Sequence, residues 1–347
     1  MNRRDRLVRA LHGEPVDAVP IWLMRQAGRH LPGYRALRAR HEILEIARTP
    51  ELAVQVTTEP LERFDLDAAV VFADITIPFF GLGVDFRIDA GIGPVITDPI
   101  RTAGAIEGLR GFEAGRDAGF VGEAIRAFRA RRPDRPIVGF AGAPFTLASY
   151  LIEGRPSREF AETRRLLHAE PALFGRLLDR LTEVTIDYLT MQAHAGAEAL
   201  QLFDTWAGQL SRRTYESVVL PRLRTVFDAL SPLKTPTIYF STVSAHLLDL
   251  AATCHASALG VDWRVPLGRV RREVGPALAL QGNLDPTALL TDAPTVRRMA
   301  REVLDELPDG LGHVFNLGHG VPPDARAECV EALVEVVHQY SASRGAA

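Results

Sequence analysis

The sequence predicts an α/β fold, a single (β/α)8 TIM barrel over residues 1–347 with a hairpin inserted after the second strand. Two observations predict it. Eight short β-branched or aliphatic runs have the length of strands that are buried on both faces. Longer amphipathic segments separate these runs, and strands that alternate with helices are typical of a parallel sheet.

The candidate strands follow one another at spacings that leave room for a helix after each. In chain order they are Val19–Met24, Ala68–Ala73, Pro136–Ala141, Ala199–Asp204, Thr237–Ser241, Leu259–Trp263, Leu278–Gly282 and Gly312–Leu317. Two of the intervening helices are marked by apolar residues at helical spacing. These residues are Leu177, Leu181, Val184 and Tyr188 in one helix, and Val330, Leu333, Val334 and Val337 in the other.

One segment interrupts the alternation. Residues 81–97 read as a hairpin, because two β-prone runs flank the turn Ala90-Gly91-Ile92-Gly93. An open, doubly wound sheet is the main alternative to the barrel. A nucleotide-binding sheet of that kind usually carries a glycine fingerprint after its first strand, and none is present here.

Composition excludes several classes of protein. The chain has 347 residues, 47% of them hydrophobic, and a formal net charge of −3, so nothing points to a nucleic-acid partner. No apolar run approaches the roughly 20 residues of a membrane helix. Cys254 and Cys329 are too few for a disulfide framework, and no apolar signal segment follows the first residues. We expect a cytoplasmic protein.

Two arginines follow the first candidate strand. Arg25 and Arg29 lie four residues apart, with Gly28 between them, where ligands bind in such barrels. Arginine is a planar, permanently charged fork that suits carboxylate or phosphate. Since nearly all basic residues of this chain are arginine, only the placement of these two is informative. The pattern predicts a site for an anionic substrate.

Other polar residues follow later strands, and each has a structural alternative. Asp74 is a candidate site residue or a helix cap, Tyr150 a site or packing residue, and Thr205 a site residue or an N-cap. Asp204 is likewise either a site residue or a structural residue. His319 lies between two glycines, which is a poor place for a core histidine. Asp285, before a proline, is most simply a turn residue.

Several catalytic motifs are missing from the sequence. It contains no P-loop and no Gly-x-Ser-x-Gly elbow. Cys254-His255 stands alone, without the spacing of a zinc site. The one lysine, Lys234, precedes the fifth strand, so a Schiff-base mechanism has no candidate. The residues therefore predict a barrel that uses neither metal nor organic cofactor.

Six blocks of the sequence resemble the uroporphyrinogen decarboxylase family. Residues 20–29 resemble its N-terminal signature, and residues 139–150 resemble its second signature. Further family blocks match in order at residues 72–74, 202–208, 281–286 and 315–320. The resemblance runs from about Arg4 to Tyr340, so it covers almost the whole chain.

The resemblance implies a single (β/α)8 domain that converts the four acetate arms of uroporphyrinogen III to methyl groups. The product is coproporphyrinogen III, an intermediate of haem biosynthesis. The resemblance also implies that no cofactor is used and that the protein forms a homodimer.

Site residues carry over one by one from the matching motifs. Arg25 and Arg29 match the arginines that bind substrate carboxylates, and Asp74 matches the aspartate that faces the pyrrole N–H groups. These three are the expected catalytic residues. The remaining expected substrate-binding residues are Gln26, Ala27, Gly28, Tyr150, Phe203, Thr205 and His319.

Three positions depart from the commonest family pattern. Thr205 stands where some members have serine, and the hydroxyl is kept. His30 and Gly33 stand where many members have tyrosine and an acidic residue. We interpret both as loop variation.

Two other functions are alternatives for a chain of this fold. One is zinc-dependent, corrinoid-linked methyl transfer by relatives on the same barrel, which needs Cys and His ligands at strand ends. No cysteine ends a candidate strand here. The other is a non-catalytic tetrapyrrole carrier. The presence of Asp74, an expected catalytic residue, disfavours a carrier.

Overall fold

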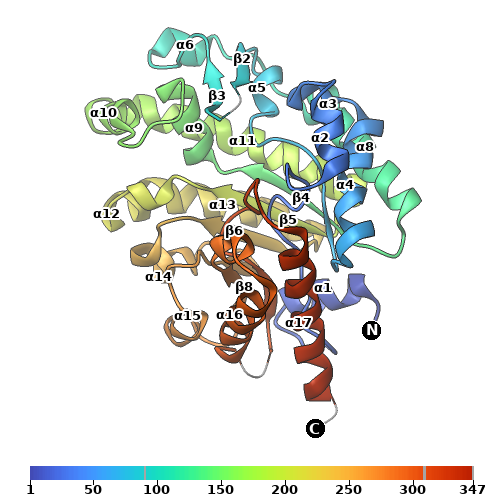
Figure 1. The fold of residues 1–347 in the computed structure, drawn as a ribbon. Coiled ribbons are helices and arrows are strands. Elements are labelled where there is room, and N and C mark those ends of the chain that lie inside the picture. The colour runs from blue at the N-terminus through green and yellow to red at the C-terminus, as the bar shows by residue number, and fades with distance from the viewer. Residues whose placement is uncertain (90, 308–309, 346–347) are drawn as a thin grey trace.

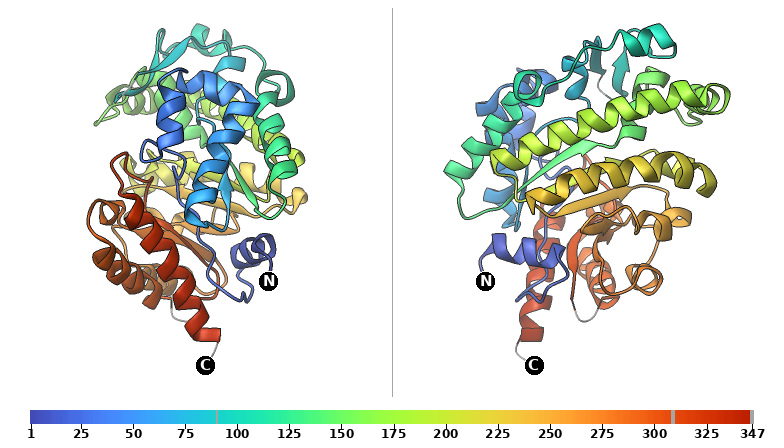
Figure 2. Two further views of the ribbon diagram at one scale, coloured as in Figure 1. Left: turned by 45° about the vertical axis from the view of Figure 1, so that its right-hand side comes forward. Right: turned by 180° about the vertical axis from the view of Figure 1, so that it is seen from behind.

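The structure, a computed structural model, describes residues 1–89, 91–307 and 310–345. Within these residues, seven strands form a parallel sheet whose spatial order follows the chain. In Figures 1 and 2 the helices lie around the outside of this curled sheet. The strands are β1 (Ala69–Val70), β4 (Ile137–Gly142), β5 (Ala199–Asp204), β6 (Thr237–Ser241), β7 (Ala258–Gly260), β8 (Ala279–Leu284) and β9 (His313–Leu317).

Among the described residues, four helices precede β1, the last helix follows β9, and the other helices lie in the connections between the strands. The first ten are α1 (Arg3–Leu11), α2 (Pro32–Arg38), α3 (Ile43–Arg48), α4 (Pro50–Phe64), α5 (Pro78–Gly81), α6 (Ala103–Glu107), α7 (Ala114–Asp117), α8 (Gly119–Arg131), α9 (Pro144–Glu153) and α10 (Ala161–Ala169). The others are α11 (Pro171–Ala195), α12 (Arg212–Thr214), α13 (Leu220–Leu230), α14 (Leu248–Ala251), α15 (Leu267–Val274), α16 (Ala293–Asp305) and α17 (Ala327–Gly345).

The predicted first strand, Val19–Met24, is not a regular strand. It makes one parallel bridge, between Ile21 and Phe315 of β9. Side chains take its backbone N–H groups in place of a neighbouring strand: Asp67 accepts from Ile21, Gln26 from Leu23 and Asn316 from Met24. Trp22 N–H instead donates to the Phe315 carbonyl of β9 at 3.3 Å. Because side chains replace part of the ladder, the segment is extended without being a full strand.

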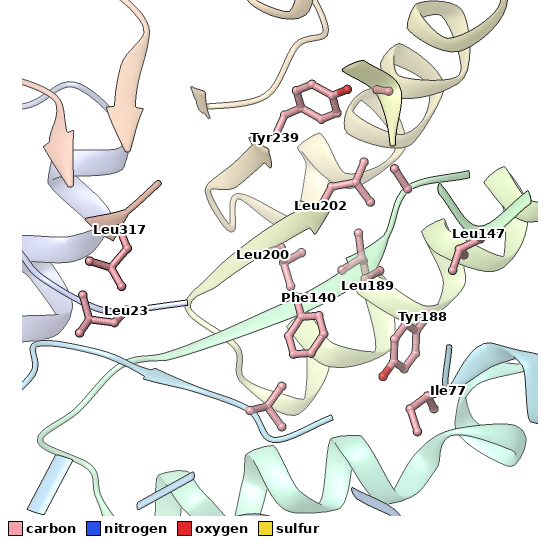
Figure 3. Close-up of a cluster of buried hydrophobic side chains, with 14 of the residues drawn as sticks. Leu23, Ile77, Phe140, Leu147, Tyr188, Leu189, Leu200, Leu202, Tyr239 and Leu317 are labelled. Carbon is pink, nitrogen blue, oxygen red and sulfur yellow. The ribbon is translucent and has the colours of Figure 1, made fainter. Parts of the chain in front are cut away.

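This segment nevertheless lies between the two ends of the sheet. Phe315 N–H donates to the Pro20 carbonyl at 2.8 Å, and Asp67 N–H donates to the Ile21 carbonyl at 2.8 Å. Leu23 and Leu317, each two residues beyond the bridged pair, lie next to each other in Figure 3. Backbone hydrogen bonds therefore join residues 20–21 to β9 on one side and to the residues before β1 on the other.

Two apolar cores follow from the alternation of side chains along the strands. The large core, part of which Figure 3 shows, packs residues such as Leu200, Leu202 and Tyr188 between the sheet and its helices. The small core lies on the opposite face of the strands. Its members are Trp22, Met24, Ala68, Val138, Ala199, Ile238, Phe240, Ala258, Ala279 and Val314, together with Leu7, Ala10 and Leu11 of α1.

An antiparallel pair of strands lies between β1 and β4 in the sequence. β2 (Phe86–Asp89) pairs with β3 (Gly93–Ile96). The expected hairpin began at Gly81, but that residue ends α5. Ala90 of the expected turn lies outside the described residues. Ile96 N–H donates to the Gly154 carbonyl at 2.7 Å, which attaches this pair to the end of α9.

Several predicted boundaries are shifted. The second strand is reduced from Ala68–Ala73 to the two residues of β1, and the sixth ends at Gly260 instead of Trp263. The seventh continues to Leu284. Among the described residues, no helix is both long enough and apolar enough to cross a membrane.

Candidate active site

The expected site residues come from different strands but follow the same ends of those strands. Arg25 and Arg29 follow the extended segment, Asp74 follows β1, and His319 follows β9. Tyr150 lies on α9, directly after β4. Carboxyl ends of parallel strands meet at one edge of a sheet, which in barrels is where catalysis occurs. We call this edge the rim.

The loop that carries the two arginines has a defined conformation. Arg25 has φ +59°, a left-handed conformation that is uncommon outside glycine. Gln26 is buried, its Oε1 accepting from Leu23 N–H and its Nε2 donating to the Ala68 carbonyl. The Gln26 side chain therefore fastens the loop to the residue before β1.

Arg25 and Arg29 are both exposed, and neither forms an ion pair with any described residue. The stem of Arg25 passes over Gly320, where an added Cβ would lie 2.4 Å from Arg25 Cδ. At Gly28 an added Cβ would lie 3.1 Å from the Arg25 carbonyl oxygen, so the loop is also tight there. The partly buried Ala27 packs against the large core.

The two carboxylate oxygens of Asp74 differ in their hydrogen bonding. Oδ1 accepts hydrogen bonds from the backbone N–H and the hydroxyl of Thr76, at 2.9 and 2.5 Å. Oδ2 has no donor among the described residues. The helix-cap interpretation of Asp74 is wrong, because the N-cap of α5 is Ile77 and no side chain caps that helix. Oδ1 instead holds a local turn with Thr76, and Oδ2 is left for a ligand.

Three tyrosines lie within electrostatic range of Asp74. Burial is the main cause that raises the pKa of Tyr34, Tyr150 and Tyr188, and the negative charge of Asp74 adds to it in each case. The pKa of Tyr150 rises to about 12, so it remains a neutral phenol. The hydroxyl of Tyr188 is buried without a hydrogen-bond partner.

His319 is neutral and has a fixed tautomer. Its Nδ1 accepts the Gly320 N–H at 2.7 Å, so the neutral ring carries its proton on Nε2. Burial is the main cause that lowers its pKa to about 4, and the charges of Arg25 and Arg264 contribute to the same shift. His319 can therefore donate a hydrogen bond from Nε2 at neutral pH without carrying a charge.

The residues at the end of β5 and directly after it differ in their surroundings, and Phe203 is packed among aromatic rings. Phe203 packs edge-to-face against Phe140 and Phe240, with ring centroids 5.5 and 6.0 Å apart. Thr205 is partly buried, and its carbonyl accepts from the Thr242 hydroxyl. These contacts place Phe203 as an aromatic wall residue.

Asp204 is a structural residue. It is fully buried, and its two oxygens accept from the Thr146 and Tyr239 hydroxyls at 2.7 and 2.9 Å. Burial raises its pKa to about 6. Both oxygens are occupied, so this carboxylate has a structural explanation.

The two unusual loop positions also have structural explanations. The buried His30 stacks on Phe64 of α4, with ring centroids 6.1 Å apart, and burial lowers its pKa to about 4. Gly33 N–H and Tyr34 N–H donate to the two carboxylate oxygens of Glu59. A Cβ at Gly33 would lie 2.7 Å from that carboxylate, so this chain caps α2 from another helix.

Sequence reasoning missed four residues near the expected site. Tyr34 and Tyr188 lie on helices, where they read as packing residues. Trp263 and Arg264 follow β7, and the Trp263 ring lies 6.4 Å from the His319 ring. Their position after a strand was the available signal, although the high arginine content obscured Arg264.

The residues do not form an evident metal site. In the described ranges, no group of three or more His, Cys, Asp or Glu side chains is arranged to hold an ion. Cys254 is buried, and burial raises the pKa of its thiol to about 12. It is therefore a poor source of thiolate.

Comparison with known proteins identifies the family of the chain. The family model described as uroporphyrinogen decarboxylase (URO-D) matches residues 2–340. A uroporphyrinogen decarboxylase from Streptomyces griseus is 45% identical over 335 residues, which are 96% of this chain and 92% of the relative. One from Syntrophotalea carbinolica is 43% identical over 97% of this chain and 98% of the relative.

Solved structures support the fold. A methyltransferase from Methanosarcina mazei aligns with a TM-score of 0.81 over 98% of this chain and 99% of its own, at 23% identity. A B12-independent methionine synthase from Shewanella sp. W3-18-1 aligns with a TM-score of 0.56 over 93% and 96%, at 11% identity. At these identities the likeness concerns the fold alone. Together with the full-length family match, the findings show that this chain belongs to the uroporphyrinogen decarboxylase family.

Proposed function

We propose that this chain removes carbon dioxide from the four acetate arms of uroporphyrinogen III and so forms coproporphyrinogen III for haem biosynthesis. The observation that carries the proposal is the charge pattern of the rim. Arg25 and Arg29 have no carboxylate partner among the described residues, and Asp74 has one oxygen without a donor. A substrate with eight carboxylates and four pyrrole N–H groups supplies the missing partners for both.

The chemistry needs no cofactor because the substrate provides its own electron sink. Protonation of a pyrrole ring carbon gives a cationic, iminium-like ring. The C–C bond to the acetate carboxylate then breaks, and its electron pair neutralises the ring as carbon dioxide leaves. Protonation of the resulting methylene gives the methyl group, and loss of the ring proton restores the pyrrole.

Asp74 is proposed to stabilise the cationic ring. A fixed carboxylate beside the pyrrole N–H groups favours positive charge where it develops, and it also holds the macrocycle in place. Thr76 fixes the orientation of the carboxylate through Oδ1. The partly buried location strengthens this interaction relative to water.

The arginines and the neutral polar residues are proposed to bind the arms and walls of the substrate. Arg25 and Arg29 hold carboxylates, since a guanidinium matches them in charge and shape. The phenol of Tyr150 and the Nε2–H of His319 position substrate as neutral donors. The other proposed binding residues are Gln26, Ala27, Gly28, Phe203 and Thr205.

The finer architecture is also proposed. Residues 1–347 form one catalytic domain, in which the segment Val19–Met24 closes the sheet as the eighth member of a (β/α)8 barrel and the β2–β3 pair is the inserted hairpin. The hydrogen bonds at Pro20 and Ile21 support the closure. By family resemblance we propose a cytoplasmic homodimer.

Methyl transfer is disfavoured as an alternative by the residues at the rim. Such chemistry needs a thiolate-activating metal with Cys and His ligands. Cys254 follows α14 and is a buried thiol, and Cys329 is a buried residue of α17. Neither is available to a ligand at the rim.

An anaerobic turnover assay tests the proposal. The protein, treated with a chelator, is incubated with uroporphyrinogen III, and the products are oxidised and separated by carboxylate number. We expect coproporphyrin, with four molecules of carbon dioxide released for each substrate. Binding of uroporphyrinogen without release of carbon dioxide would contradict a catalytic function and favour a carrier.

A further inference from the structure

A third arginine, Arg264, lies at the rim on the loop between β7 and α15. Its guanidinium carbon lies 3.8 Å from the centroid of the Trp263 indole ring. The other neighbour of this indole is the His319 ring, at 6.4 Å and nearly perpendicular. The three side chains form a stack of guanidinium, indole and imidazole, which we call the rim stack.

The backbone that carries the rim stack is firmly held. Asn283 Nδ2 donates to the carbonyls of Asp262 and Val265, at 2.8 and 2.6 Å, and so spans the loop. On the other side Gly318 packs against the backbone of Trp263. A Cβ added at Gly318 would lie 2.2 Å from the backbone nitrogen of Trp263. The indole is therefore a rigid support for Arg264.

Arg264 is only partly neutralised by the protein. Asp262 accepts its backbone N–H at 2.9 Å and its Nη1 at 3.1 Å. The same carboxylate also accepts the Val243 N–H. Asp262 is 4% exposed and the Arg264 side chain 44% exposed, and in the described part of the chain no acceptor meets Nε or Nη2. One edge of the guanidinium is fixed, and its other donors are available.

Arg264 and Arg25 both lie near the same neutral histidine. The stem of Arg25 packs over Gly320, next to His319, whereas Arg264 reaches His319 through Trp263. Their positive charges both contribute to the low pKa of His319. Two cations around one neutral N–H donor form a place where an anion replaces water with little reorganisation.

We propose that Arg264 binds a carboxylate of the substrate near His319, as a third arginine of the site beside Arg25 and Arg29. The inference rests on the proposed function and extends it, because it assigns a binding role to the loop after β7. A pair with Asp262 for stability alone is the competing explanation. Asp262 is buried, but it also accepts the backbone N–H groups of Val243 and Arg264, so the half-exposed guanidinium is not the only partner of this carboxylate.

The test uses two substitutions and a matched control. Arg264→Ala removes the guanidinium, and Arg264→Met keeps an unbranched apolar stem over Trp263. Arg269→Ala is the control, since Arg269 is an exposed arginine five residues on that pairs with Glu273 at 2.7 Å. For each protein the KM and kcat for uroporphyrinogen III and the Kd for coproporphyrinogen III are measured at two salt concentrations.

We expect both Arg264 variants to raise the KM by about 10- to 100-fold, with kcat within a few-fold of the parent. Their binding should also depend less on salt. The control should stay within about two-fold. An increase in KM without a change in Kd for the product would indicate an acetate arm, and an increase in both a propionate arm; either result supports the proposal.

Unchanged KM and Kd in Arg264→Met would overturn the proposal. A fall in kcat with unchanged KM would also overturn it, since the role would then not be binding. If the parent protein does not turn over uroporphyrinogen III, the proposed function fails. The Kd for uroporphyrinogen III, which carries both acetate and propionate arms, then still decides whether Arg264 binds a tetrapyrrole carboxylate.

Discussion

The two ends of the sheet use arginine in opposite ways. At the end where the strands begin, arginines pair with buried carboxylates: Arg6 with Asp67 at 3.1 Å, and Arg129 with Glu198 at 3.2 Å. At the rim, Arg25 and Arg29 have no carboxylate partner among the described residues. The first end is electrostatically satisfied by the protein itself. At the rim, Arg264 pairs with the buried Asp262, whereas Arg25 and Arg29 are left for a ligand.

This difference separates stability from function. Breaking a buried ion pair leaves an uncompensated charge, which is costly for folding. Removing an exposed, unpaired charge changes folding little. We therefore expect substitutions at the rim to reduce activity with small effects on stability, and substitutions at the other end to do the reverse.

The largest effect is expected at Asp74. Asp74→Asn keeps an oxygen for the Thr76 turn but removes the negative charge, so kcat should fall by about 10²- to 10³-fold with little change in Tm. Asp285 is a matched control, because its Oδ1 accepts from Thr287 N–H and hydroxyl in the same Asp-x-Thr turn. Asp285→Asn should keep near-parental turnover. Equal turnover by the Asp74→Asn and Asp285→Asn variants would show that the negative charge of Asp74 has no special function in catalysis.

The opposite result is expected at Asp67. This buried carboxylate accepts from Ile21 N–H and pairs with Arg3, Arg6 and His338. Asp67→Asn should lower the free energy of unfolding by about 2 kcal/mol, less than for a fully buried pair because the arginines are partly exposed. The kcat of the folded protein should remain unchanged. Chemical denaturation and a turnover assay on the same preparation check both parts.

The contribution of Asp67 to the free energy of unfolding is expected to change with pH in one direction. Burial raises the pKa of Asp67, but its hydrogen bond to His338 and the nearby charges more than offset this, so the folded-state pKa is lowered. Its stabilisation is therefore full above the unfolded pKa of about 3.9 and is lost as the pH falls through the folded value. Destabilisation of the Asn variant should accordingly disappear in acid. A constant difference between the two proteins down to pH 2 would contradict this assignment.

Smaller effects are expected from the arginines singly. Arg29→Ala and Arg25→Ala should each raise the KM about 10-fold or more, since each removes charge-assisted hydrogen bonds to a substrate carboxylate. Arg298, which is exposed and pairs with Glu302 on α16, offers a control outside the rim. Its Ala variant should keep the parental KM within about two-fold. Similar KM values in all three variants would show that placement at the rim does not matter.

The smallest effect is expected at His30. Its pKa of about 4 lies below the ordinary value of 6.5, so the unfolded chain binds more protons between these values. The stability due to neutral His30 is full above pH 6.5 and is lost as the pH falls toward 4. His30→Phe, which keeps an aromatic ring on Phe64, should make the loss of stability over this range shallower. His255→Phe, at an exposed histidine, is the control and should leave the slope unchanged.

Much of the fold could be predicted from the sequence because each buried strand is a short apolar run followed by a helix. The first strand could not, since Asp67, Gln26 and Asn316 replace part of its ladder with side-chain hydrogen bonds. These partners are distant in sequence or have no periodic pattern, so nothing local shows their role.

The site could be predicted to a similar extent. Arg25, Asp74 and His319 could be proposed from the sequence because each follows an apolar run, and the structure places all three at the same end of the sheet. Tyr188 was not found, because its helical spacing marks it as a packing residue although its hydroxyl is buried without a partner near Asp74. His30, which the motif left unexplained, is accounted for by a stacking partner that the sequence does not reveal.

The central claim is that the ligand completes the charges that the protein leaves unpaired at the rim. A crystal structure with coproporphyrinogen III bound tests it most directly. We predict that Asp74 Oδ2 accepts hydrogen bonds from the pyrrole N–H groups, with propionates at the rim arginines. A macrocycle bound with its N–H groups turned away from Asp74, or with its carboxylates in solvent, would contradict the account.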